Sequence, residues 1–406
     1  MAVNNVLLGF FILSSFYYFK KENFKCSIYL VFPIVLFIWM ALSYFWTINP
    51  DRTSQAIPKE ISLLLVPLVF FWIPYYTKEQ KDKIITNYSY AMVVYVIYFL
   101  IRAFIRFLIT NDSSVFFYHG PDNETDTGLV PRLLNAIHFS VYVAIAFFYF
   151  FIKEHKSKWE QIASLLLFIF VILLSSKNII LIFVLLILIQ VFFYSKIANR
   201  LRLRNLTLLL IVLGAVLSFS KIKERFLVEF RTNSDKSISH NIALNKNEGI
   251  NNISIADAWT KEQFHPSDYF PGTAFRVYQF RMFTEFLFEE PIFWNGFGLN
   301  ASLSKLQQKE KFYNLYPGYG NFNFHNQYVQ NFAELGAIGF VLLLIILIIN
   351  TKKAFNSKDF MHIAFAILML SLFLTESFLW RQRGVVFFTT FYCLFNFINN
   401  PSVKKN

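Results

Sequence analysis

Charged residues are scarce in this chain: Asp, Glu, Lys and Arg make up 16% of its 406 residues, against 56% for hydrophobic residues. The mean hydropathy is +0.45. A soluble domain has about a quarter of its residues charged, and a single anchor helix would not lower that share so far. The composition therefore excludes a soluble globular protein and predicts an all-α integral membrane protein.

Cysteine, metal-binding motifs and nucleotide-binding motifs are also scarce or missing. The only two cysteines, Cys26 and Cys393, lie outside the long polar segment of the chain, so neither a disulfide framework nor a zinc site is available there. The sequence contains no HExxH, DxD or P-loop motif. We therefore expect no metal ion and no cofactor. The N-terminus has no basic stretch before its apolar run, which favours a first span over a cleaved signal.

Long apolar runs fill most of the chain. A helix needs about 20 mostly apolar residues to span a bilayer. Eleven runs approach that length: 3–19, 27–47, 57–76, 86–109, 133–152, 160–175, 178–195, 205–220, 327–350, 360–379 and 384–399. We expect about 11–12 transmembrane helices.

The basic residues, which give a net charge of +13, occur in short clusters between these runs. This distribution argues against nucleic acid as a partner and is typical of cytoplasmic loops. The clusters recur in alternate loops, at 20–25, 78–83, 153–158, 196–204, 352–358 and 404–405. The opposite loop 111–131 is acidic. The positive-inside rule then predicts an outer N-terminus, a cytoplasmic C-terminus and an outer location for the polar stretch 221–324.

This topology divides the chain into N-terminal transmembrane helices (1–220), one large outer loop (221–324) and C-terminal transmembrane helices (325–406). Within the loop, residues 273–290 have aromatic residues at helical spacing. They predict an amphipathic helix that begins with Thr273 as its N-cap and ends before a proline. We expect this helix to lie across the outer mouth of the bundle.

Ionisable residues near the outer ends of the spans are costly to keep there, and they are therefore candidates for function. Most of them are cations, which suits a lipid-linked anion such as a diphosphate. The set comprises Arg102, Arg106, Arg132, Lys177, Arg276, Arg281, His325, Glu334, Glu376, Arg381 and Arg383.

Several of these cations also have a structural explanation. Lys177 lies at an outer turn, where the long aliphatic side chain of a lysine can extend and bring its ammonium group to water. Arg102 and Arg106 are four residues apart and share a helix face, where they either hold a phosphate or extend to the interface. Arg276 and Arg281 are five residues apart and point in different directions, so at most one of them faces the cavity squarely. For Arg281, a surface role is at least as well supported as a role in binding a ligand.

The segment NFHNQYVQNFAELGAIGF, residues 323–340, stands where the large loop enters a span. A helix N-terminus disfavours imidazolium, and neutral imidazole is the form that a general base requires. His325 is therefore either a base or an N-capping or interfacial histidine. Glu334 lies about half a turn around the helix and is not expected at the same site. Gly336 and Gly339 give the helix a small face for close packing.

This order of features resembles the bacterial O-antigen ligase and O-antigen polymerase superfamily, whose members transfer glycans from undecaprenyl diphosphate at the outer face of the inner membrane. Four segments support the resemblance: SSKN at the start of a span, an arginine-bearing loop helix followed by EEPIFWNGFG, the segment HNQYVQNFAELGAIG, and LTESFLWRQRGVVFF. Together they cover roughly residues 170–395.

The resemblance implies a C-type glycosyltransferase fold and a metal-independent, inverting transfer. It places the family's loop arginine on Arg276 and its histidine on His325. The family commonly has arginine where Lys177 stands, tryptophan where Phe280 stands, and twelve spans with both ends cytoplasmic. Arg281 is a further diphosphate-binding candidate, and the secondary candidates are Arg102, Arg106, Asn326, Glu376 and Arg381.

We therefore expect a multi-pass enzyme of the bacterial inner membrane that moves a glycan from undecaprenyl diphosphate to a hydroxyl of lipid A–core, with its large loop in the periplasm. The close alternative is a polymerase, whose acceptor is another lipid-linked repeat unit, and protein is a third possible acceptor. The rival from another class is a transporter or flippase of lipid-linked sugar. Such proteins typically have repeats and broken helices, and the sequence predicts neither.

Overall fold

The computed structural model describes residues 2–24, 27–117, 128–174, 176–195, 214 and 251–397. The expected span 205–220 and the loop residues 221–250 lie outside this set, apart from Gly214. The chain forms two compact units. The first comprises Met1–Ile84, Gln279–Lys309 and Gly320–Asn406, and the second comprises Ile85–Tyr278 and Glu310–Tyr319.

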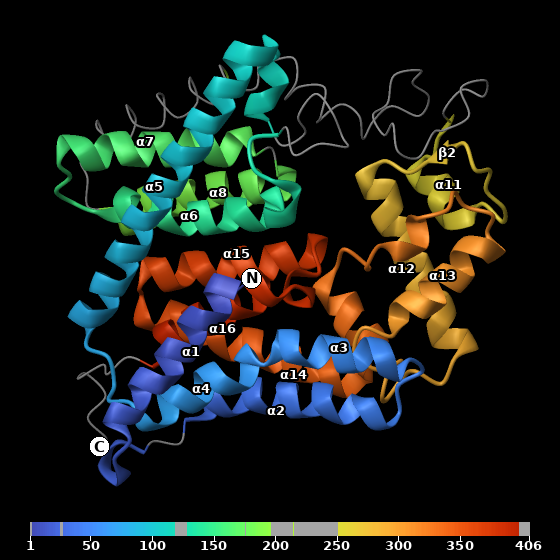
Figure 1. Cartoon of the computed structure of the whole chain (residues 1–406), viewed down its shortest axis with the longest axis horizontal. Helices are drawn as coiled ribbons and strands as arrows, with labels where there is room; N and C mark the ends of the chain where they lie inside the picture. Colours follow the sequence, from blue (N-terminus) through green and yellow to red (C-terminus); the bar gives the residue numbers. More distant parts are fainter. Residues whose placement is uncertain are drawn as a thin grey trace. The chain divides into compact units, whose positions relative to one another are not determined.

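The first unit is built around a helical bundle (Figure 1). Its helices are α1 (Ala2–Ser15), α2 (Ile28–Leu42), α3 (Pro50–Glu60), α4 (Ser62–Trp72), α14 (Gln327–Ser357), α15 (Phe360–Thr375) and α16 (Gln382–Asn396). α2 packs against α4 and α14, α16 packs against α4, and α15 packs against α14. Side chains such as Leu36, Val66, Leu343 and Phe388 are fully enclosed between these helices. Helices from both ends of the sequence therefore share one core.

Polar residues set the starts of several of these helices. Asn49 precedes α3, and its Oδ1 accepts the N–H of Arg52 at 3.1 Å. Asp359 precedes α15 and accepts the N–H of Met361 at 3.0 Å. Each side chain satisfies a backbone donor that the first turn of a helix cannot pair by itself.

The second unit contains most of α5 (Lys78–Thr110), α6 (Ala136–Ile152), α7 (Lys158–Leu173) and α8 (Lys177–Ile189), which ends in a π-helical turn, η6 (Gln190–Tyr194). α6 packs against α7 and α8. The rings of Phe147 and Phe183 lie 4.7 Å apart, centroid to centroid, and Phe168 lies 5.7 Å from Phe183. The frequent phenylalanines of the sequence thus form the packing layer between these helices.

The described part of the large loop contributes to both units. In the second unit, β1 (Asn251–Asn252) pairs in parallel with β2 (Asp268–Tyr269), and α11 (Ile255–Thr260) lies between them in sequence. An aromatic cluster of Phe264, Phe270, Tyr278, Tyr313 and Tyr319 packs beside them. The loop also contains α12 (Gly272–Glu289) and α13 (Ser302–Phe312). It is therefore a folded element rather than a linker.

The helix expected over residues 273–290 is α12. Its first backbone hydrogen bond runs from the N–H of Phe275 to the carbonyl of Pro271 at 2.9 Å. Thr273 therefore lies inside the first turn, and its prediction as the N-cap is wrong, because the carbonyl that starts the helix belongs to Pro271. The side chains at helical spacing on one face, Phe275, Tyr278, Met282 and Phe286, are buried.

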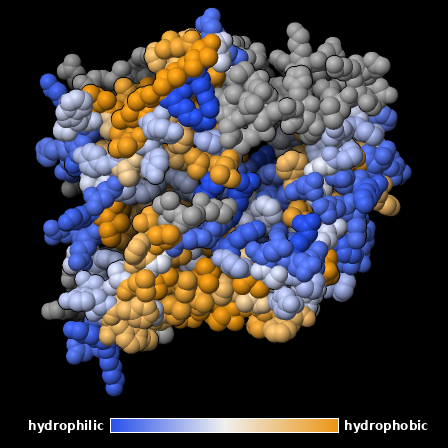
Figure 2. Space-filling model, in the orientation of Figure 1, coloured by the Kyte–Doolittle hydropathy of each residue, from blue (hydrophilic) through white to orange (hydrophobic). Residues whose placement is uncertain are grey.

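Five of the described helical stretches are long and apolar enough to cross a membrane: Ile28–Phe45, Pro50–Trp72, Lys78–Thr110, Lys177–Tyr194 and Gln327–Ser357. Three shorter apolar helices are Asn5–Tyr18, Ala136–Ile152 and Phe360–Thr375. Figure 2 shows apolar residues gathered over α2 and α4. In the described residues, the strands amount to one two-residue pair. The prediction of an all-α integral membrane protein is confirmed.

Ten of the eleven expected apolar runs coincide with helices, and the eleventh, 205–220, is the one outside the described residues. Two of the ten, 160–175 and 384–399, form α7 and α16, which are among neither the five long stretches nor the three shorter apolar helices named above. The total of 11–12 membrane crossings stays a prediction.

Candidate functional site

His325 stands at the junction between the large loop and α14. Asn326 follows it and caps the helix, because its Oδ1 accepts the N–H of Tyr328 at 3.0 Å and of Val329 at 3.1 Å. The N-capping explanation for His325 is therefore wrong. Asn326 has the structural role instead.

The backbone of His325 is in the left-handed region, with φ of +46°. This conformation is uncommon for residues other than glycine and costs free energy. Asn323 stabilises it, because its Oδ1 accepts the N–H of His325 at 3.0 Å. The neighbouring N–H of Phe324 donates to Oε1 of Gln330 at 3.1 Å. A strained residue held in this way is typical of a functional position.

The imidazole of His325 contacts α12. Its Nδ1 lies 3.1 Å from Oε1 of Gln279, and the Nε2 of Gln279 donates to the carbonyl of Asn323. The ring of Phe322 lies 5.8 Å away, centroid to centroid. Gln279 is buried, whereas His325 is only half-buried. A fixed ring that keeps some exposure is the arrangement that a general base needs.

Arg276 precedes Gln279 by three residues on α12, and residues at this spacing share a helix face. Its Nη1 donates to the carbonyl of Gly272 at 3.1 Å. Lys177 is the first residue of α8 and is half-buried. Arg276 and Lys177 belong to the second unit and His325 to the first. The shared cavity expected for these three residues stays a prediction.

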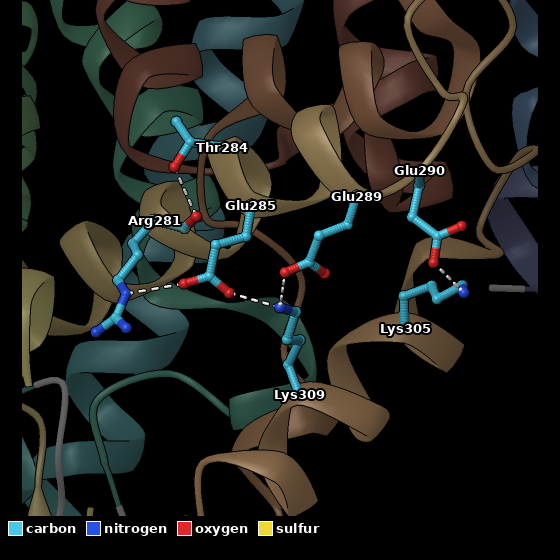
Figure 3. Close-up of polar contacts among 7 residues, drawn as sticks. All are labelled: Arg281, Thr284, Glu285, Glu289, Glu290, Lys305 and Lys309. Carbon is cyan, nitrogen blue, oxygen red and sulfur yellow. Dashed lines mark hydrogen bonds and ion pairs between the residues drawn. The ribbon is translucent and has the colours of Figure 1, made fainter. Parts of the chain in front are cut away.

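Arg281, the further diphosphate candidate, belongs to a charged row between α12 and α13 (Figure 3). The row comprises Arg281, Glu285, Glu289, Glu290, Lys305 and Lys309. Nε of Arg281 lies 2.9 Å from Oε1 of Glu285, and Nζ of Lys309 lies 2.6 Å from Oε2 of the same carboxylate. Because Glu285 offsets part of its charge, Arg281 attracts an external anion less than an isolated guanidinium would.

The charged row also fixes Lys309, which is buried. Burial by itself would lower the pKa of this ammonium group, but the hydrogen bonds with Glu285 and Glu289 outweigh burial and raise the pKa above its ordinary value. The row therefore joins α12 to α13 by ion pairs between Lys309 of α13 and two carboxylates of α12, Glu285 and Glu289.

The secondary candidates occupy varied settings. Arg102 and Arg106 lie one turn apart on α5, and Nη1 of Arg106 donates to the carbonyl of Gly128 at 3.3 Å. Glu376 is buried just after α15, and Arg381 is exposed just before α16. Among the described residues, no group of three or more His, Cys, Asp or Glu side chains is arranged to hold a metal ion.

α14 is broken at Gly336, where φ is +67° and ψ is −170°. A Cβ at this position would lie 2.1 Å from the carbonyl oxygen of Trp294. The segment 293–298, which we call the strap, bonds to the backbone groups around the break: Phe297 N–H to Ala333 O at 2.9 Å, Gly298 N–H to Glu334 O at 2.8 Å, and Ala337 N–H to Phe293 O at 2.7 Å. The strap thus replaces hydrogen bonds that a continuous helix would make within itself.

The break corrects two interpretations of the sequence. Gly336 allows close approach, as expected, but of a loop backbone rather than of another helix. The expectation of no broken helix is wrong, because the left-handed glycine interrupts α14. Glu334 is buried, and its Oε1 accepts from Ser302 Oγ at 2.9 Å and Gln330 Nε2 at 2.5 Å.

Gln279 and Asn323 are the two residues around His325 that the sequence analysis missed. The available signals were local. Gln279 is the one uncharged polar side chain between Arg276 and Arg281 apart from a tyrosine. Asn323 stands two residues before His325, which is the spacing of an asparagine side chain that bonds its own backbone two residues on.

The fold and the site together define a helical integral membrane protein with a histidine held where a folded loop meets a span. Residues 162–344 match the family model described as O-antigen ligase. This match includes Lys177, Arg276 and His325 and supports the resemblance of the sequence to the O-antigen ligase superfamily. In general terms it supports a membrane glycosyltransferase of the O-antigen ligase and polymerase type. The comparison with curated proteins found no match.

Proposed function

We propose that this protein is a glycosyltransferase of the O-antigen ligase type, which moves a glycan from undecaprenyl diphosphate to an acceptor hydroxyl on lipid A–core. The main support is His325. Its strained backbone is held by Asn323 and its ring by Gln279, and it lies inside the segment that matches the family.

In the proposed reaction, His325 takes the proton of the acceptor hydroxyl while the hydroxyl oxygen attacks the anomeric carbon of the donor. The bond between that carbon and the diphosphate oxygen breaks on the opposite face, so the configuration inverts. The bonding electron pair leaves with undecaprenyl diphosphate, and the proton stays on the imidazole. A diphosphate is already a good leaving group, so the enzyme needs to supply a base and to stabilise the departing charge.

Arg276 and Lys177 are the proposed cations for the diphosphate. Fixed positive groups at the position where charge develops stabilise a transition state more than mobile water does. Arginine can hold a phosphate with two parallel hydrogen bonds, whereas lysine supplies a single point charge. We assign Arg281 a supporting role, because it already pairs with Glu285 at 2.9 Å. The proposal includes no metal ion and no cofactor.

The proposed location is the bacterial inner membrane, with the large loop and the N-terminus in the periplasm and the C-terminus in the cytoplasm. The basic clusters in alternate loops and the acidic loop 111–131 between two of them support this orientation. In this orientation, His325 and α12 lie on the periplasmic side, where the lipid carrier presents its glycan.

Replacing His325 provides the first test. His325→Ala should lower the transfer rate about 10²–10⁴-fold, the usual cost of losing a general base. The measurement is glycan transfer from a purified lipid-linked donor by the protein in reconstituted membranes. His265→Ala is the matched control, since His265 is an exposed loop histidine whose Nδ1 lies 2.8 Å from Ser267 Oγ. Equal turnover by His325→Ala and the control would contradict the role of His325 as the base.

Two further outcomes separate the alternatives. In a deletion strain, loss of all capped lipopolysaccharide chains supports a ligase, and loss of only the ladder above one repeat unit supports a polymerase. Movement of the donor across the membrane without transfer would favour a flippase. The break at Gly336 does not favour transport, because backbone groups on both sides of it are hydrogen-bonded to the strap.

A further inference from the structure

We propose that Gln279 is a positioning residue that fixes His325 in the tautomer with hydrogen on Nδ1, so that Nε2 is the basic nitrogen. The use of Nε2 as the base rests on the proposed function. The tautomer does not, because it can be measured in the absence of any substrate.

The backbone carbonyl of Asn323 fixes the orientation of the Gln279 side-chain amide. Its Nε2 donates to the backbone carbonyl of Asn323, and a carbonyl oxygen can only accept a hydrogen bond. If the amide were reversed, its oxygen would face that carbonyl oxygen and two acceptors would oppose each other. The amide oxygen of Gln279 is therefore the atom that faces His325.

That orientation determines which ring nitrogen carries hydrogen. Oε1 of Gln279 lies 3.1 Å from Nδ1 of His325. Because an amide oxygen only accepts, Nδ1 must be the donor. In neutral imidazole the second nitrogen, Nε2, then has the lone pair that can take a proton. A histidine with the other tautomer would present an N–H at Nε2 and could not act there as a base.

Because Gln279 and Asn323 are buried, water cannot readily take the place of their hydrogen bonds. Gln279 is 1% exposed and Asn323 is 9% exposed, so water has little access to either group. Losing one partner would leave buried polar atoms without a hydrogen bond, which costs more than the bond itself contributes. Asn323 also accepts the backbone N–H of His325 at 3.0 Å. The same pair of residues therefore holds both the backbone and the ring.

The direct test is ¹⁵N NMR of the full chain labelled at histidine and reconstituted in lipid nanodiscs, at a pH where the ring is neutral. The His325 signals are identified by their loss in His325→Ala. We expect a protonated Nδ1 and an unprotonated Nε2 in the wild type. Gln279→Met, which lacks an acceptor, should shift the signals towards the other tautomer. A wild-type spectrum with hydrogen on Nε2 would overturn the inference.

Transfer kinetics give a second readout. Gln279→Met should lower kcat about 10–10²-fold and change KM little. This is the range found for residues that orient a functional histidine by bonding its other ring nitrogen. Gln279→Glu keeps an oxygen opposite Nδ1 but loses the donor to the carbonyl of Asn323, so it should recover only part of the rate. Gln263→Met is the control, since Gln263 is an exposed loop glutamine whose Nε2 donates to the carbonyl of Phe312 at 3.4 Å.

The outcomes separate this inference from the proposed function. If His325→Ala keeps its turnover while the wild type shows hydrogen on Nδ1, the base assignment fails and the tautomer assignment stands. If His325→Ala is inactive but Gln279→Met transfers at the wild-type rate, the positioning role of Gln279 is overturned. If Gln279→Met does not fold, the wild-type spectrum still decides whether Nδ1 carries the hydrogen.

Discussion

Lys177 and Arg276 are the two residues on which the proposed diphosphate site depends. Their cationic groups differ in geometry, and the two residues lie on different helices. Lys177 is the first residue of α8, and Arg276 lies in the first turns of α12. A lysine holds an anion with one compact ammonium group, whereas arginine presents a planar fork of donors. The two cations are therefore expected to respond differently to exchange.

Lys177→Ala should lower kcat/KM for the lipid-linked donor about 10²–10³-fold, the usual loss for removing one stabilising donor of a transition state. Lys177→Arg should keep the activity, because it retains the charge and adds the fork. Lys158→Ala is the control, since Lys158 is also the first residue of a helix, α7, but is exposed. The proposal for Lys177 would fail if both alanine variants behaved alike.

At the residue scale, the sequence predicted the junction histidine but not its partners. His325 could be found because it stands at the start of an apolar run. Gln279 could not, because its bond to His325 joins residues 46 positions apart, and nothing in a helical pattern identifies such a pair. The pairing of Arg281 with Glu285 could not be predicted either, because the sequence cannot say which of several nearby carboxylates a guanidinium selects.

At the scale of single elements, the break in α14 requires glycine at position 336. A side chain there would meet the backbone of Trp294 at 2.1 Å, and a backbone cannot move aside as a flexible side chain can. The φ of +67° adds strain for any residue with a Cβ. This combination has a direct consequence for stability.

Gly336→Ala should lower the free energy of unfolding by about 2 kcal/mol or more, from overpacking and from backbone strain. The measurement is the loss of monodisperse protein with temperature in detergent. Gly9→Ala serves as the control, because Gly9 is also in a helix but has open space around its Cβ position. Equal melting of the two variants would show that the strap can move away from α14.

The small β1–α11–β2 element depends on one buried carboxylate, Asp268. Burial by itself would raise the pKa of Asp268, but hydrogen bonds from Lys261, the N–H of His265 and Asn251 outweigh burial and lower the pKa below its ordinary value. A carboxyl whose pKa is lower in the folded state stabilises the fold above the unfolded pKa, about 4. That stabilisation is lost as the pH falls through the folded pKa.

Residues 251–270 should therefore exchange amide hydrogen faster at a pH of about 3 than at neutral pH, after correction for the intrinsic rate. Asp268→Asn removes the titrating group and should flatten this dependence. An unchanged pH dependence in Asp268→Asn would assign the acid sensitivity to another residue.

At the scale of the whole molecule, the apolar runs predicted the helices well because a membrane span requires a length of apolar sequence that few other structures need. They did not predict which helices pack together. The first compact unit takes α2 and α4 from the start of the chain and α14 and α16 from its end. Such pairing depends on side-chain shape along whole helices, which hydropathy does not report.

The predicted orientation can be tested on the intact molecule. In a chain with Cys26→Ser and Cys393→Ser, an impermeant maleimide should label Lys311→Cys from outside the cell, because Lys311 is an exposed residue of the large loop. Ser357→Cys, an exposed position at the end of α14, should be labelled only after the membrane is opened. The reverse pattern would invert the proposed topology.

The strap, the residue that follows it and the break in α14 are also held by a distant part of the sequence. The indole N–H of Trp46 donates to the carbonyl of Asn295 at 2.9 Å, and that of Trp39 donates to Leu335 at 2.9 Å. The hydroxyl of Thr53 donates to the carbonyl of Leu299 at 2.8 Å. These three residues precede the family segment 162–344 by more than a hundred positions. The segment 162–344 is consequently not an independent folding unit. Without the helices that precede it, it would lose the three hydrogen bonds that hold the strap and the break in α14 in place.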